Sequence, residues 1–122
     1  MTALHQLSTL DLAAAIRRRE VSAVEVTEAT LERATTAGAA VGAFAHVTPE
    51  FALAQAEHAD AALSAARTDD ERAALPPFLG VPVPIKDLNQ MAGVPFEAGS
   101  AVLRGNVAAV DDGVVTLLPD VN

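Results

Sequence analysis

Two helix-start signals near the beginning of the chain constrain the fold more than any other feature. Residues 22–25 read Ser-Ala-Val-Glu, a capping box in which serine and glutamate side chains satisfy free N–H groups of a first helical turn. Residues 8–11 read Ser-Thr-Leu-Asp, a related pattern with an acidic residue near the helix start. Two starts so close together predict a short first helix, through Ile16 towards Glu20, followed at once by a second.

The next signals extend this helical region. Gly38 can end the second helix in a left-handed conformation. Thr48 and Pro49 predict the N-cap and first turn of a third helix that reaches about Ala66. Its apolar residues recur at helical spacing. The buried face is expected to draw on Phe51, Ala52, Leu53, Ala56, Ala59 and Leu63.

Other segments carry weaker signals. Residues 41–47 form a short apolar run that predicts a strand, in which His46 is expected to be a core histidine rather than a catalyst. Residues 68–77 are polar and then proline-rich, which predicts a connecting loop. Residues 107–118 are interpreted as a final helix, with the acidic side chains of Asp111 and Asp112 near its N-terminus, where they suit the helix dipole.

Length and composition limit the size of the core. The 122 residues suffice for one domain, and about a fifth of them are alanine, which buries little surface. Four Phe and no Tyr or Trp leave few large side chains. We therefore expect a thin core.

Charge and cysteine content restrict the partners. The net charge of −8 argues against direct nucleic-acid binding, which needs clustered Lys and Arg. The basic run at residues 17–19 suits a helix C-terminus and needs no ligand. No cysteine is present, no metal-ligand spacing occurs, and no signal peptide or membrane span is recognised. We expect a cytoplasmic protein without cofactor, metal or membrane contact.

Residues 78–87 read Phe-Leu-Gly-Val-Pro-Val-Pro-Ile-Lys-Asp and predict an apolar strand. Pro82 and Pro84 lack N–H groups on the same edge, so the strand can use only its other edge for N–H donation. Lys86, the only lysine, then lies at the strand end, where desolvation of the ammonium favours a neutral amine that can act as a base. An exposed lysine beside Asp87 fits the spacing as well.

This segment, followed by Gly-Val-Pro at residues 93–95 and Gly-Ser at residues 99–100, resembles the start of the amidase-signature core. The likeness runs from the N-terminal helices to about Val115. It implies an α/β fold, with an N-terminal helical layer and the first strands of a mixed-sheet core, incomplete in this chain. The implied organisation is a single partial amidase domain over residues 1–122, with the helical layer at 1–67, a loop at 68–77 and the start of the core at 78–122.

The resemblance also implies a reaction, the hydrolysis of a carboxylic amide through a serine acyl-enzyme. Lys86 matches the base that relays through a cis-serine to the nucleophilic serine, while backbone N–H groups form the oxyanion hole. Neither serine can be carried over, because no two serines are adjacent and Ser100 belongs to the Gly-Ser turn. We therefore expect a truncated chain that is inactive by itself. Its serines are Ser8, Ser22, Ser64 and Ser100.

Two alternatives remain open. The chain can belong to the amidase-like subunit of a tRNA-dependent amidotransferase, in which glutamine is the ammonia donor. It can also be a non-catalytic remnant or interaction module, whose exposed apolar surface favours self-association or a partner chain. A small-molecule amide is the expected substrate of a complete enzyme.

Overall fold

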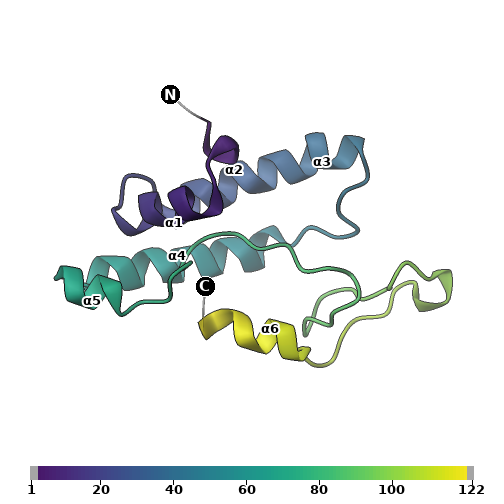
Figure 1. The fold of residues 1–122 in the computed structure, drawn as a ribbon. Helices are drawn as coiled ribbons and strands as arrows, with labels where there is room; N and C mark the ends of the chain where they lie inside the picture. The colour runs from purple at the N-terminus through teal and green to yellow at the C-terminus, as the bar shows by residue number, and fades with distance from the viewer. Residues whose placement is uncertain (1–2, 121–122) are drawn as a thin grey trace. The chain divides into compact units, whose positions relative to one another are not determined.

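The computed structural model describes residues 3–120, which form two compact units, residues 3–82 and residues 83–120. Within residues 3–120 no β-strand is present, and the only bridge is an isolated antiparallel one between Pro95 and Val107. Helices dominate the first unit, as Figure 1 shows. They are η1 (Leu4–Gln6), α1 (Thr9–Arg17), α2 (Ala23–Thr35), α3 (Ala37–Ala40), α4 (Pro49–Ala65) and α5 (Asp69–Ala73), and the second unit has η2 (Ala101–Leu103), α6 (Gly113–Leu117) and η3 (Leu118–Asp120).

The predicted starts of α1 and α2 are confirmed. Ser8 Oγ accepts a hydrogen bond from the N–H of Asp11 at 3.1 Å. At α2, Ser22 Oγ accepts from the Glu25 N–H at 3.0 Å, and Glu25 Oε2 accepts from the Ser22 N–H at 2.8 Å. The backbone N–H and the hydroxyl of Ser22 both donate to this carboxylate, so they hold the pKa of Glu25 below its ordinary value. The residues next to each start therefore supply a cap for both helices.

Asp60 of α4 adds a tertiary cap to α2. Its two carboxylate oxygens accept from the N–H groups of Ala23 at 2.8 Å and Val24 at 3.1 Å. The first turn of a helix leaves four N–H groups without helical partners. Ser22 and Asp60 together satisfy those of the first three helical residues, and the acidic group also suits the positive end of the helix dipole. This contact fastens α4 to the start of α2.

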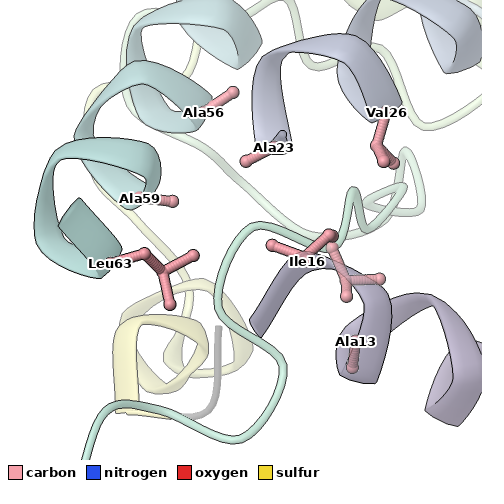
Figure 2. Close-up of a cluster of buried hydrophobic side chains, with 8 residues drawn as sticks. Ala13, Ile16, Ala23, Val26, Ala56, Ala59 and Leu63 are labelled. Atoms are coloured by element: carbon pink, nitrogen blue, oxygen red, sulfur yellow. The ribbon is translucent and has the colours of Figure 1, made fainter. Parts of the chain in front are cut away.

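The core of the first unit lies where α1, α2 and α4 meet, and α2 runs beside α4 (Figure 1). Ile16 and Val26 are its largest fully buried side chains. Most other members are alanines, whose small side chains allow close helix packing. Figure 2 shows these residues converging from the three helices. The cluster is Ala13, Ile16, Ala23, Val26, Ala56, Ala59, Leu63 and Val81.

Gly80 occupies the tightest point of this core. Its φ of +84° lies in the left-handed region, and a Cβ there would come within 2.7 Å of the Ala23 Cβ. The same Cβ would lie 3.3 Å from Cγ2 of Ile16 and 3.5 Å from the Ala59 Cβ. One glycine is therefore required both by its backbone conformation and by three converging helices.

The first unit also corrects the predictions for the segment between α2 and α4. Residues 41–47 form turns and irregular backbone, so the predicted strand is wrong, and His46 is exposed rather than in the core. Gly38 does not end α2 but lies inside the short helix α3, while Gly42 takes the left-handed conformation with φ +62°. A strand needs a neighbouring strand for its ladder, and the described residues provide none.

Two further differences concern α4 and α5. Ala56, Ala59 and Leu63 are buried as predicted, but Phe51 is 45% exposed, because the buried stripe begins nearer the middle of α4. The predicted loop at residues 68–77 contains α5, which begins with a capping box of Thr68 and Glu71. In it, the N–H groups of Arg67 and Thr68 donate to Glu71 and lower its pKa.

The basic run at residues 17–19 has a structural partner. Arg17 donates hydrogen bonds to the backbone carbonyl oxygens of Arg72 and Pro76, the latter at 2.6 Å. It therefore joins the end of α1 to the end of α5. Arg18 forms an exposed ion pair with Glu20 at 2.6 Å. No ligand is needed to explain either side chain.

Replacing Gly80 by alanine tests the close approach at the core. Gly80→Ala is expected to lower the free energy of unfolding by more than Gly42→Ala, which shares the left-handed conformation but has open space around its Cβ. The conformational penalty alone is about 1–2 kcal/mol, and the contact with Ala23 adds to it only at Gly80. Urea denaturation of the two variants measures the difference, and equal losses would contradict the packing role of Gly80.

Candidate functional site

Lys86 lies on irregular backbone at the start of a turn in the second unit. Residues 81–86 form no strand, and the Lys86 side chain is exposed. The predicted strand is therefore wrong, and the exposed side chain agrees with the alternative of an exposed lysine beside Asp87. Pro82 and Pro84 have no backbone N–H group to donate to a neighbouring strand. The described residues also contain no strand with which this segment could pair along its other edge.

The turn after Lys86 is closed by its own carbonyl group. Lys86 O accepts hydrogen bonds from the N–H groups of Leu88 at 2.7 Å and Asn89 at 2.9 Å. The adjacent Asp87 is half-buried, and its Oδ1 accepts from the Glu97 N–H at 3.1 Å. One turn thus presents the Lys86 side chain to solvent while Asp87 is directed to the backbone of a distant residue.

Glu97 belongs to a loop that is folded back on itself. Its Oε1 accepts from the Gly105 N–H at 2.8 Å, and its carbonyl oxygen accepts from the Ser100 N–H at 2.8 Å. Backbone pairs flank the bridge between Pro95 and Val107. They are Gly93 N–H to Ala108 O at 2.9 Å, Ala108 N–H to Val94 O at 3.0 Å, and Phe96 N–H to Asn106 O at 2.9 Å. We call residues 93–108 the paired loop.

Asp111 and Asp112 also bind backbone. Asp112 Oδ2 accepts from the Gln90 N–H at 2.8 Å, and the Asp112 N–H donates to Gln90 O at 2.9 Å. Asp111 Oδ1 accepts from the Ala92 N–H at 2.7 Å. The predicted helix over residues 107–118 is reduced to α6 (Gly113–Leu117), and the Asp112 side chain makes no hydrogen bond that caps it. These carboxylates hold the loop after Lys86 instead, a role the sequence pattern did not indicate.

The four serines have ordinary positions. Ser8 and Ser22 cap helices, Ser64 is exposed on α4, and Ser100 Oγ accepts from the Val102 N–H at 3.3 Å within its turn. Residues 3–120 contain no group of three His, Asp or Glu side chains placed to hold a metal ion. None of the helices within that range is long and apolar enough to cross a bilayer.

Comparisons with known proteins place these features in a family. The model of the family described as Amidase matches residues 25–120, a range that includes Lys86 and the paired loop. A Synechocystis protein named "Putative amidase" is 43% identical over 115 residues, which cover 94% of this chain and 22% of the relative.

Two further relatives are named as a subunit of glutamyl-tRNA(Gln) amidotransferase. The protein of Dinoroseobacter shibae is 47% identical over 105 residues, covering 84% of this chain and 20% of its own length. The protein of Paenarthrobacter aurescens is 44% identical over 111 residues, which cover 91% of this chain and 21% of the relative. The chain therefore spans about a fifth of the length of the curated relatives it matches.

Removing the Asp112 carboxylate should loosen the loop that follows Lys86. Asp112→Ala is expected to speed hydrogen exchange of the Gln90 amide by about tenfold or more, because a hydrogen bond to a charged group is lost. Asp112→Asn keeps an acceptor oxygen and should have a smaller effect. Exchange followed by NMR measures both, and an unchanged Gln90 rate in Asp112→Ala would contradict this contact.

Proposed function

The chain belongs to the amidase family, and we propose that it supplies the base, Lys86, of an enzyme that hydrolyses carboxylic amides. The observation that carries this proposal is the family match over residues 25–120, which contains the Lys-Asp segment and the Gly-Ser turn. The small-molecule substrate is an amide whose acyl group is transferred first to a serine and then to water.

The chemistry assigns one role to this chain. As a neutral amine, Lys86 would take a proton from a cis-serine, which in turn takes one from the nucleophilic serine. Backbone N–H groups would stabilise the oxyanion. Ser8 and Ser22 are occupied in helix caps and Ser100 in its turn, while Ser64 lies exposed on α4 with no other serine beside it in the sequence. We therefore propose that both catalytic serines come from residues other than 1–122.

The exposure of Lys86 also indicates that residues outside 1–122 are needed to complete the site. A general base must be neutral when it takes a proton, and removal from water favours the neutral form of an amine. We propose that the region bearing the serines also covers Lys86 and removes it from water. Residues 1–122 would then be one part of a single cytoplasmic amidase domain, with the core beginning at residue 78, and would not hydrolyse amides without that region.

The exposed apolar side chains of the second unit support such a covering. Val102 is 92% exposed, and Leu117 is 64% exposed. Several valines of residues 83–120 are also open to solvent. Apolar surface of this kind is stabilised when another surface packs on it. The same observation supports the alternative of a non-catalytic interaction module, which would use this surface for self-association or for a partner chain.

A second enzymatic candidate is one component of a tRNA-dependent amidotransferase. The 47% and 44% identities to proteins with that name favour it. In this case glutamine would be the amide that is hydrolysed, its ammonia would be passed on, and partner subunits would be present. Direct RNA contact by this acidic chain is not part of the proposal, because its net charge of −8 opposes phosphate binding.

A chimera tests the assignment of Lys86. This chain would replace the matched 115-residue stretch of the Synechocystis relative, and hydrolysis of simple amides would be followed by ammonia release. Lys86→Ala is expected to lower kcat by roughly 10²- to 10⁴-fold, the usual contribution of a general base. Lys86→Arg should fail as well, because a guanidinium stays protonated.

Three controls make the result specific. Arg104→Ala removes another exposed basic side chain of the second unit and should leave kcat unchanged. Purified residues 1–122 should show no hydrolysis above background. A matching chimera with the Dinoroseobacter shibae relative tests the second candidate, which requires glutamine hydrolysis that depends on partner subunits. A Lys86→Ala chimera that keeps full turnover would overturn the role of Lys86 as base.

A further inference from the structure

We propose that Asp87 is a positioning residue for Lys86, acting through the turn that the two residues share. This inference rests on the function proposed for Lys86 and adds a second residue to it. Asp87 is suited to this role by its contact with backbone rather than by its charge alone, because its Oδ1 accepts the N–H of Glu97 at 3.1 Å.

The turn that follows Lys86 is short. Lys86 lies where irregular backbone enters a turn, and its carbonyl group closes that turn by accepting from the N–H groups of Leu88 and Asn89. Short turns of this kind open readily when they stand alone. An exposed lysine on such a turn would sample many positions for its amine.

The Asp87 side chain is bound to the paired loop through Glu97. Glu97 is held in the paired loop by its own carboxylate, which accepts from Gly105, and by its carbonyl group, which accepts from Ser100. The hydrogen bond from the Glu97 N–H to Asp87 therefore connects the turn to a segment with several backbone pairs. Asp87 reaches across ten residues of sequence to make this connection.

Catalysis by Lys86 would depend on where its amine lies. A general base acts only when its nitrogen lies within hydrogen-bond distance of the proton it removes, and small displacements cost large factors in rate. Since Lys86 and Asp87 are neighbours in the chain, fixing the Asp87 side chain fixes the direction in which Lys86 leaves the backbone. Loss of the acceptor at Asp87 should therefore reduce kcat, while substrate binding, measured by KM, stays the same.

Variants of Asp87 in the Synechocystis chimera separate a hydrogen-bonding role from a role of charge. Asp87→Ala removes the acceptor and is expected to lower kcat by roughly tenfold to a hundredfold. Asp87→Asn keeps an oxygen that can accept from Glu97, so it should restore kcat to within about threefold and leave the pH profile in place. Glu71→Ala removes a comparable carboxylate contact in the first unit, to the N–H groups of Arg67 and Thr68, and serves as the matched control.

The intact chain of 122 residues provides a second measurement that needs no activity. In Asp87→Ala, exchange of the Glu97 amide should accelerate by roughly tenfold, and ¹⁵N relaxation should show increased motion at residues 86–89. Asp87→Asn and Glu71→Ala should leave both close to the unmodified chain. This arm applies even if the Asp87→Ala chimera fails to fold.

The outcomes are distinct. An inactive parent chimera, or a Lys86→Ala chimera with full turnover, would count against the proposed function, while amide exchange and relaxation still decide whether Asp87 fixes the turn. The positioning role would be overturned if kcat fell as far in Asp87→Asn as in Asp87→Ala. It would also be overturned if Asp87→Ala changed KM and left kcat unchanged. Unchanged Glu97 exchange and unchanged motion at residues 86–89 in Asp87→Ala would overturn it as well.

Discussion

The structure of the first unit depends on the carboxylate of Asp60 at the start of α2. This side chain binds the N–H groups of Ala23 and Val24, and Ala23 is also the residue that Gly80 approaches most closely. Helix α4 is thereby fixed where α1 and the backbone at Gly80 and Val81 pack against α2. Because the core consists largely of alanines, its packing supplies less stabilisation than leucine or phenylalanine would. Directed hydrogen bonds are correspondingly more important.

The same kind of contact recurs throughout the chain and explains the use of its acidic residues. Glu25 and Glu71 complete capping boxes in the first unit, and Asp87 and Asp112 hold loop backbone in the second. In each case a carboxylate accepts an N–H group that secondary structure leaves unsatisfied. The net charge of −8 therefore reflects structural roles as well as solvation. In the second unit these contacts lie around Lys86, and they provide the basis for the positioning role proposed for Asp87.

Sequence reasoning succeeded where the determinants are local. The caps at Ser8 and Ser22, and the buried face with Ala56 and Leu63, follow from neighbouring residues and helical spacing. It failed for the strands at residues 41–47 and 78–87, because a strand forms only with a partner that the apolar pattern does not specify. The Lys-Asp segment indicated the family, which the comparisons confirmed. Contacts across many residues, such as that of Asp60 with α2, leave no signal in a single sequence.

The stability of Asp60 variants tests most directly whether carboxylate contacts to backbone N–H groups hold this chain together. Asp60→Ala is expected to lower the free energy of unfolding by about 2–4 kcal/mol, because two charge-assisted hydrogen bonds are lost. Asp60→Asn should lose less, and Asp70→Ala, at an exposed position of α5, should be nearly neutral. Urea denaturation of the three variants measures these differences. An Asp60→Ala variant as stable as Asp70→Ala would contradict the account.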